Sequence, residues 1–212
     1  MKQQKLNEEL KKYIETKIFP LYDENEKGHD IEHINSVITR SLKLAKDYDV
    51  DINLVYTIAS YHDLGHHIDR KTHEIISAKM FMEDENMKAF FSEEERIIIK
   101  EAIEDHRASS NHEPRTIYGK LVSTADRTIL DIETPIKRTY SYGLVHHPKF
   151  TKEEQIEEVY DHLNNKFGRN GYAKIYLKDP EYDESLERLR KALDDKENFI
   201  KKIYEVIEKE GL

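Results

Sequence analysis

The residues of this sequence best suited to chemistry are an adjacent histidine and aspartate, His62 and Asp63, which stand shortly before Gly65. An imidazole nitrogen and a carboxylate oxygen together suit Mn, Fe, Co, Ni or Zn, and a carboxylate also suits Mg. Because His62 follows Ile58 and Ala59 by four and three residues, it shares the apolar face of the helix expected there. One such pair is weak by itself, since a surface pair or a histidine favoured by the helix dipole has the same sequence.

Three more polar residues lie on the apolar faces of other expected helices. His33 stands four residues before Val37, and His106 stands three residues after Ile103. Asp126 also follows an apolar residue by one helical turn. A buried, unpaired carboxylate is costly, so an inward aspartate needs a metal, a cation or several hydrogen bonds. Polar residues on the inward faces of four different helices therefore predict a shared ion.

The elements that must position these residues are predicted to be helices. The chain has 212 residues with only 7 Gly and 5 Pro, and its apolar residues recur at helical spacing almost throughout. Strand signals are weak everywhere, so the predicted fold class is all-α. The length suits one domain with a sizeable core, and no Pro-rich or Gly-rich linker divides the sequence.

Capping residues delimit several of the expected helices. Asp30 and Asp51 can each cap a helix that begins at the next residue. Ser92 and Thr151 are each followed three residues later by a glutamate, which is the pattern of a capping box. A first helix is expected to end before Pro20.

Two stretches in the C-terminal third are harder to interpret. Residues 133–147 form the most irregular stretch, for which we predict a long loop or short helices. From Leu186 to Ile207 the apolar residues alternate at three and four, with one break at Lys196. This spacing predicts one long helix packed on its own domain; the alternative is a seam between two copies of the chain.

Charge and composition narrow the class of protein. The net charge of -9 argues against a general nucleic-acid binder, although a small anionic substrate could bind through a local cluster of cations. No apolar run could span a membrane, and the charged N-terminus from Met1 has no signal-peptide core. With no cysteine in the chain, we expect a cytoplasmic protein that is a monomer or homodimer.

In order and spacing, His33, the pair His62-Asp63 and Asp126 resemble the H…HD…D signature of the HD superfamily of metal-dependent phosphohydrolases. The segment Gly28–Ile34 is similar to the first-helix motif of small HD nucleotide pyrophosphohydrolases, and Tyr61–His66 is similar to an HDLGH motif. The resemblance covers about residues 20 to 130. It implies an all-helical HD-domain bundle, which we expect to be a single domain over residues 1–212 with a C-terminal helical extension over about residues 150–210.

The resemblance extends to the two-metal members of the superfamily and implies one or two divalent transition-metal ions. Mn²⁺ and Fe²⁺ are the first candidates. Asp63 would bridge the ions. Two departures matter: Arg107 stands where HD-GYP proteins have a second histidine, and His66-His67 replaces the Glu-Asp pair of alarmone hydrolases. The implied metal ligands are His33, His62, Asp63, His73, His106 and Asp126.

The resemblance implies that a metal-activated water cleaves a phosphoester or phosphoanhydride bond of a small anionic substrate, and a nucleotide is the first candidate. Asp63 and His66 would be the catalytic residues, with His66 as a general acid; the alternative for His66 is a solvated loop residue. The remaining histidines, His29 among them, are interpreted as surface or structural residues. Two other functions stay open: a di-iron oxygenase with the same ligands, and a non-catalytic HD module that binds a nucleotide. The candidate phosphate-binding residues are Arg127, Arg107 and Arg138.

Overall fold

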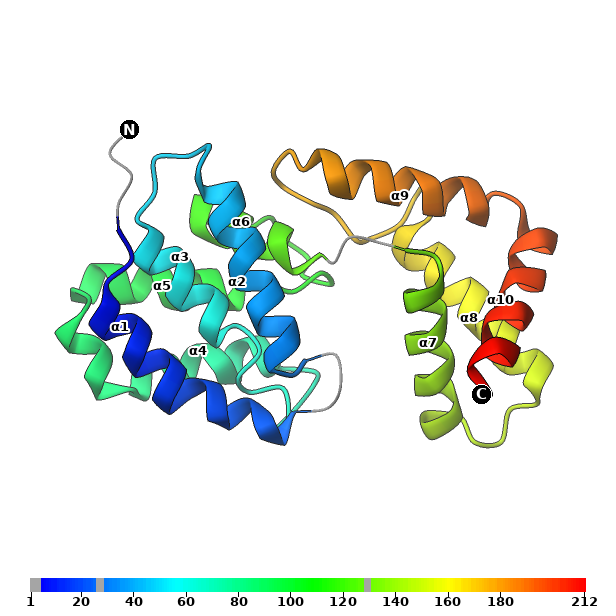
Figure 1. Cartoon of the computed structure of the whole chain (residues 1–212), viewed down its shortest axis with the longest axis horizontal. Helices are drawn as coiled ribbons and strands as arrows, with labels where there is room; N and C mark the ends of the chain where they lie inside the picture. The colour runs from blue at the N-terminus through cyan, green and yellow to red at the C-terminus, as the bar shows by residue number, and fades with distance from the viewer. Residues whose placement is uncertain (1–4, 26–28, 128–130) are drawn as a thin grey trace. The chain divides into compact units, whose positions relative to one another are not determined.

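The described part of the chain consists of helices, turns and loops. The computed structural model describes residues 5–25, 29–127 and 131–212, and within these ranges no strand is present, which confirms the all-α prediction (Figure 1). Met1 and Gly28, both used above, lie outside the described residues. The α-helices are α1 (Glu8–Tyr13), α2 (Ile31–Ala45), α3 (Ile52–Tyr61), α4 (His73–Glu83), α5 (Glu93–Glu104), α6 (Ile117–Asp126), α7 (Glu133–His146), α8 (Lys152–Phe167), α9 (Pro180–Leu193) and α10 (Lys196–Glu210).

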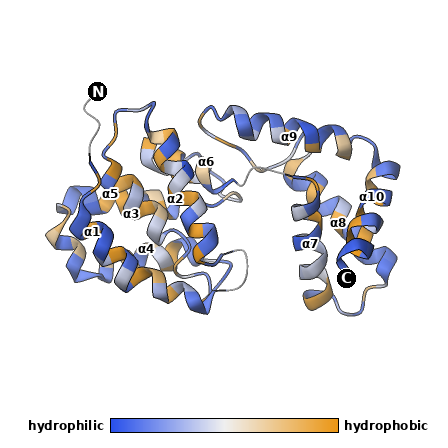
Figure 2. Cartoon of the chain, viewed as in Figure 1, coloured by the Kyte–Doolittle hydropathy of each residue, from blue (hydrophilic) through white to orange (hydrophobic). Residues whose placement is uncertain are grey.

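The chain divides into two compact units. The first comprises Met1–Arg127 with Ile175–Lys178, and the second comprises Thr128–Lys174 with Asp179–Leu212. Figure 2 shows apolar and polar residues interleaved along the helices of both units. Among the described helices, none is long and apolar enough to cross a membrane. The expected single domain with a C-terminal extension stays a prediction.

Helix α3 lies at the centre of the first unit. Every residue from Leu54 to Tyr61 is buried, and α3 packs against α2, α5 and α6. A helix buried on all sides carries apolar residues all round, and in this buried stretch only the small Thr57 and Ser60 interrupt the aliphatic and aromatic residues. Its C-terminal end therefore carries the next two residues, His62 and Asp63, into the interior of the unit.

The predicted caps are present. The Asp30 carboxylate accepts a hydrogen bond from the backbone of α2, and Asp51 does the same for α3. Ser92 and Thr151 each form a complete capping box with the glutamate three residues later. Helix α1 ends before Pro20 as predicted, but the chain continues through a π-helical turn (Ile14–Ile18) and a 3-10 helix (Phe19–Glu24).

The prediction of a long loop or short helices over residues 133–147 was wrong, because the structure has the single 14-residue helix α7 there. Ile136, Tyr140 and Gly143 are buried along one face, at spacings of four and three. Pro135 is tolerated because it stands in the first helical turn, where its missing N–H has no helical partner to lose. The buried stripe is short and includes a glycine, so the apolar pattern alone did not reveal the helix.

The prediction of one long C-terminal helix was also wrong, since the structure has two, α9 and α10. The chain turns at Asp194, and the Asp195 carboxylate then accepts a hydrogen bond from Asn198 N and starts α10. A capping aspartate offers the backbone an alternative to continuing the helix. The break coincides with the interruption noted at Lys196. Both helices pack on α8 within the second unit, and the seam between two copies stays untested.

Candidate metal centre

Asp63 lies at the centre of a cluster of imidazoles in the first unit. Its carboxylate is almost fully buried, and its two oxygens face different histidines. Oδ2 is 3.5 Å from His62 Nε2 and 3.6 Å from His33 Nε2. Oδ1 is 3.2 Å from His73 Nε2 and 3.3 Å from His106 Nε2. The carboxylate therefore separates a first pair of histidines from a second pair.

Asp126 completes the first group. It is the last residue of α6, and its Oδ1 is 3.2 Å from His33 Nε2 and 3.7 Å from His62 Nε2. The ligand atoms of His33, His62 and Asp126 all lie within 4.8 Å of one another. Helix α2, the C-terminal end of α3 and helix α6 thus bring together the four residues of the H…HD…D signature. This arrangement of imidazole nitrogens and carboxylate oxygens is consistent with a metal site.

The second group is formed at the start of α4 and just beyond the end of α5. His73 is the first residue of α4, and His106 follows Asp105, the C-cap of α5. Their Nε2 atoms are 3.1 Å apart, and both lie on the Oδ1 side of Asp63. Asp63 therefore occupies the position of a bridging ligand between the two groups.

The ring orientation of three histidines is set by backbone carbonyls close to them in the sequence. His62, His73 and His106 each place Nδ1 at hydrogen-bond distance from the carbonyl three residues earlier, at 2.8, 2.9 and 2.6 Å. A carbonyl can only accept, so each Nδ1 carries a proton and donates it. In the neutral ring Nε2 is then an acceptor with its lone pair free. Three such lone pairs converge on Asp63.

This arrangement fits a cation. Acceptor atoms that converge without a proton between them repel one another unless a positive charge lies among them. In the first group, His33 Nε2 and His62 Nε2 are buried and make no hydrogen bond. Burial alone would lower the pKa of His62, but Asp63 and Asp126 raise it to about 9, so the cluster favours a positive charge. Imidazole and carboxylate together suit a divalent transition metal.

Both carboxylates of the cluster are ionised. Burial by itself would raise the pKa of Asp63, but the surrounding imidazoles, His62 first, hold it well below its ordinary value. Burial likewise opposes the ionisation of Asp126, but the nearby imidazoles of His33 and His62 and the charge of Arg127 hold its pKa well below the ordinary value. The centre therefore offers two negative charges to a bound ion.

His66 and His29 form a stacked pair beside the cluster. His66 is buried, and its ring stacks on that of His29 with 3.7 Å between the centroids and 15° between the planes. Burial, and then the neighbouring His29, lower the pKa of His66 to about 3, so its ring is neutral near pH 7. His66 thus lies against the site rather than in a solvated loop.

His29 is the residue that sequence reasoning missed. Its Nδ1 is only 2.7 Å from Asp63 Oδ2, and together with His33 it forms a further group of potential ligands. The available signal was its position four residues before His33, which is one helical turn. That signal is weak because His29 precedes the helix, where the spacing rule does not apply.

Arg127 is buried, and both terminal nitrogens of its guanidinium donate to protein atoms. Nη1 donates to Asp126 Oδ2 at 2.9 Å, and Nη2 donates to the His106 carbonyl and to Ser123 Oγ, both at 3.1 Å. The predicted contact of Arg127 with substrate stays a prediction.

The other predicted phosphate-binding cations are placed differently. Arg107 contacts the Lys71 carbonyl and is 3.3 Å from a Glu74 carboxylate oxygen. Arg115, in the segment that follows Arg107, pairs with the buried Asp105 at 2.8 Å. Arg138 is exposed on α7, in the second unit. For Arg107 and Arg138, too, substrate binding stays a prediction.

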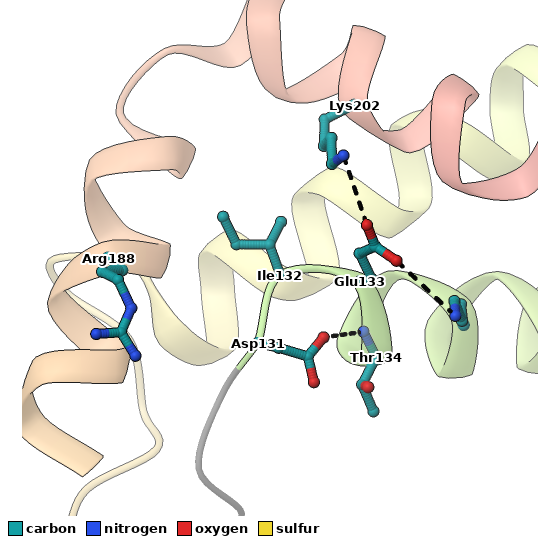
Figure 3. A pocket seen from close by; sticks show the side chains of 7 residues that line it. Asp131, Ile132, Glu133, Thr134, Arg188 and Lys202 are labelled. Carbon is teal, nitrogen blue, oxygen red and sulfur yellow. Dashed lines mark hydrogen bonds and ion pairs between the residues drawn. The ribbon is translucent and has the colours of Figure 1, made fainter. Parts of the chain in front are cut away.

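The second unit has an open pocket of 820 Å³ at the start of α7 (Figure 3). Figure 3 shows Lys202 directed at Glu133, and their charged groups are 3.6 Å apart. Lys137, which also lines the pocket, pairs with Glu210 at 2.6 Å. Arg188, on another wall, pairs with Glu184 at 2.8 Å. No residue predicted to bind metal lines this pocket.

Comparison with known proteins finds a match to the HD domain within the chain. The HD domain matches residues 30–131, the range that holds every predicted metal ligand. A crystal structure at 1.45 Å resolution of a predicted HD superfamily hydrolase from an uncultured Thermotogales bacterium is similar in fold, with a TM-score of 0.50 and 22% sequence identity over 71% of this chain and 83% of that chain. No curated protein matched the chain. Residues 30–131 are thus similar to the HD domain, the domain of the HD superfamily of metal-dependent phosphohydrolases.

Proposed function

We propose that this protein cleaves a phosphoester or phosphoanhydride bond of a small anionic substrate. A nucleotide is the first candidate for that substrate. The observation that carries the proposal is the position of Asp63, whose two oxygens each face two histidine Nε2 atoms. Such a carboxylate can bridge two ions, and paired divalent ions are typical of sites that transfer or hydrolyse phosphoryl groups.

In this proposal each group of residues has its own ion. His33, His62, Asp63 and Asp126 hold the first, and His73 and His106 hold the second with Asp63. When bound, the ions supply an activated water for attack on phosphorus and neutralise charge on the phosphoryl oxygens. Mn²⁺ and Fe²⁺ are the ions we expect, since histidine and carboxylate ligands suit both.

The chain's own residues exclude bulk water from the site and orient the substrate. His62, Asp63 and His106 are buried, which keeps bulk water away from the ligand atoms and strengthens their charge interactions. The neutral His66 stacks on His29 and is suited to orient a substrate group by a hydrogen bond. Arg107 could reach a phosphate only if it left Glu74.

Hydrolysis is tested in protein reconstituted with Mn²⁺ under strict exclusion of oxygen. We expect phosphate or pyrophosphate release from at least one member of a panel of nucleotides and phosphoesters. His62→Ala and Asp63→Ala should lose both bound metal and activity. His112→Ala is the matched control, because this histidine is in the same unit but 53% of its side chain is exposed.

The other outcomes separate the alternatives. Absence of anaerobic release, together with oxygen consumption by the Fe²⁺ form on an organic substrate, would replace the hydrolase by an oxygenase. Metal binding without either reaction would indicate a non-catalytic module. Metal analysis of His106→Ala tests the second ion: we expect one ion where the wild type binds two, and an unchanged stoichiometry would remove the second site.

A further inference from the structure

The Arg127 guanidinium is buried in the first unit, although it directly follows a predicted metal ligand. Only 5% of its side chain is exposed. A buried guanidinium is costly unless nearby acceptors satisfy it. Asp126, His106 and Ser123 supply three such acceptors, at 2.9 to 3.1 Å. The side chain is therefore held in place by the protein.

The hydrogen bond from Arg127 gives the two oxygens of the Asp126 carboxylate different partners. Oδ2 accepts from Arg127, while Oδ1 faces His33 and His62. The last torsion of an aspartate has a broad energy minimum, so an unrestrained carboxylate would rotate. A guanidinium on one oxygen removes this freedom and leaves the other oxygen directed at the histidines.

The backbone on either side of Asp126 is also anchored. Arg40, from α2, donates Nη1 to the Ala125 carbonyl at 2.7 Å and also to the Arg127 carbonyl. Arg127 in turn reaches the His106 carbonyl beyond α5. Two arginines thus connect the segments that carry His33, His106 and Asp126.

We propose that Arg127 is a positioning residue of the metal centre, which orients Asp126 for the ion and couples the end of α6 to the His106 segment. This inference rests on the proposed function, because it requires Asp126 to be a metal ligand. It differs from the sequence-based expectation that Arg127 binds substrate. The two roles predict different measurements, because a positioning role acts on metal affinity without substrate.

The test measures Mn²⁺ affinity of the full chain by titration calorimetry, with folding monitored by circular dichroism. We expect Arg127→Gln to weaken Mn²⁺ binding about 10-fold to 100-fold, the usual effect of losing a partner of a metal ligand. Arg127→Lys keeps the charge but not the fork of donors, and should bind with intermediate affinity. If Arg127→Gln does not fold, Arg127→Lys alone decides.

Two controls separate positioning from general stability. Arg96 is also a buried arginine of this unit, but it binds Glu93 and the Met82 carbonyl and no predicted ligand. Arg96→Gln should lower stability and leave Mn²⁺ affinity unchanged. In an Asp126→Ala background, Arg127→Gln should weaken Mn²⁺ binding far less than in the wild type, because the residue through which it acts is gone.

Each remaining outcome is decisive. Wild-type Mn²⁺ binding with unchanged affinity in both Arg127 variants would overturn the inference and leave the proposed function intact. Unchanged affinity with a raised KM for a phosphorylated substrate would assign Arg127 to substrate binding instead. A wild-type chain that binds no divalent metal would overturn both proposals.

Discussion

At the scale of single residues, the metal centre depends on which nitrogen of each imidazole carries a proton. The carbonyls three residues before His62, His73 and His106 take the Nδ1 protons and leave Nε2 as the ligand atom. Partners of this kind fix the tautomer and raise the basicity of the ligand. His66, which stacks on His29 instead, has no such role in the cluster.

For His66 we therefore expect a function separate from metal binding. His66→Ala should keep its fold and its bound metal, yet lose about 10²-fold to 10⁴-fold in turnover, the range for a side chain positioned to hydrogen-bond a reacting group. Turnover and metal content are measured on the same preparation. His67→Ala is the matched control and should turn over like the wild type. Unchanged turnover in His66→Ala would leave this histidine with only a packing role.

At the scale of elements, the turn between α3 and α4 sets the distance between the two groups of ligands. The backbone of Gly65 packs against α4, and its N–H donates to Ser77 Oγ at 2.9 Å. A Cβ at this position would lie 2.6 Å from Ile76 Cγ2 and 2.8 Å from Ile76 Cβ. The absence of a side chain therefore lets α4, with His73 at its start, approach Asp63.

Replacing this glycine should move α4. We expect Gly65→Ala to lower the free energy of unfolding by about 1–3 kcal/mol, typical of overpacking, and to weaken the binding of the second ion. Urea denaturation and metal stoichiometry measure the two effects. Adding Ile76→Ala makes room for the new methyl group and should restore part of both. A stable Gly65→Ala protein with two ions would show that the contact is easily relieved.

Glu104, the last residue of α5, is expected to make the stability of the fold depend on pH. Burial opposes its ionisation, but hydrogen bonds from Lys100 at 2.5 Å and Arg115 at 2.8 Å hold the pKa of Glu104 below its ordinary value of 4.5. A carboxylate with a lowered folded-state pKa stabilises the fold above its ordinary pKa, and this stabilisation is lost as pH falls through the folded-state value.

Glu104→Gln removes this dependence. Near pH 7 the variant should be less stable than the wild type by about 1 kcal/mol at most, because solvent screens the pairs. The difference should shrink as pH falls below 4.5. Urea denaturation of both proteins over a pH series measures it. A difference independent of pH would trace the effect of the substitution to packing rather than charge.

At the scale of the whole molecule, the predicted metal ligands all belong to the first unit. A ligand that binds only the folded state stabilises it, by about 2.7 kcal/mol at 100 times Kd. We therefore expect Mn²⁺ to slow hydrogen exchange in α2, α3 and α6 of the full chain and to leave α8 and α10 unchanged. Asp63→Ala should abolish the effect. Equal protection of all five helices would show that both units unfold as one.

Much of the first unit could be predicted from short-range patterns. Helical spacing, the Asp30 and Asp51 caps and the Ser92 capping box are properties of neighbouring residues, and the structure bears them out. The inward positions of His33 and His62 follow from the same spacing. In the second unit short-range patterns predicted the Thr151 capping box but failed at α7, which has a short buried stripe, and at the aspartate cap that divides α9 from α10.

The sequence by itself thus determined the helical class, the starts of several helices and the residue types available to a metal. Only the tertiary structure decided which histidines face each oxygen of Asp63, that His29 joins them, and that Arg127 is buried against Asp126. The physical reason is that sequence patterns report only on residues close together in the chain. Spacing along a helix tells which face a side chain occupies, but distances between side chains depend on how separate helices pack.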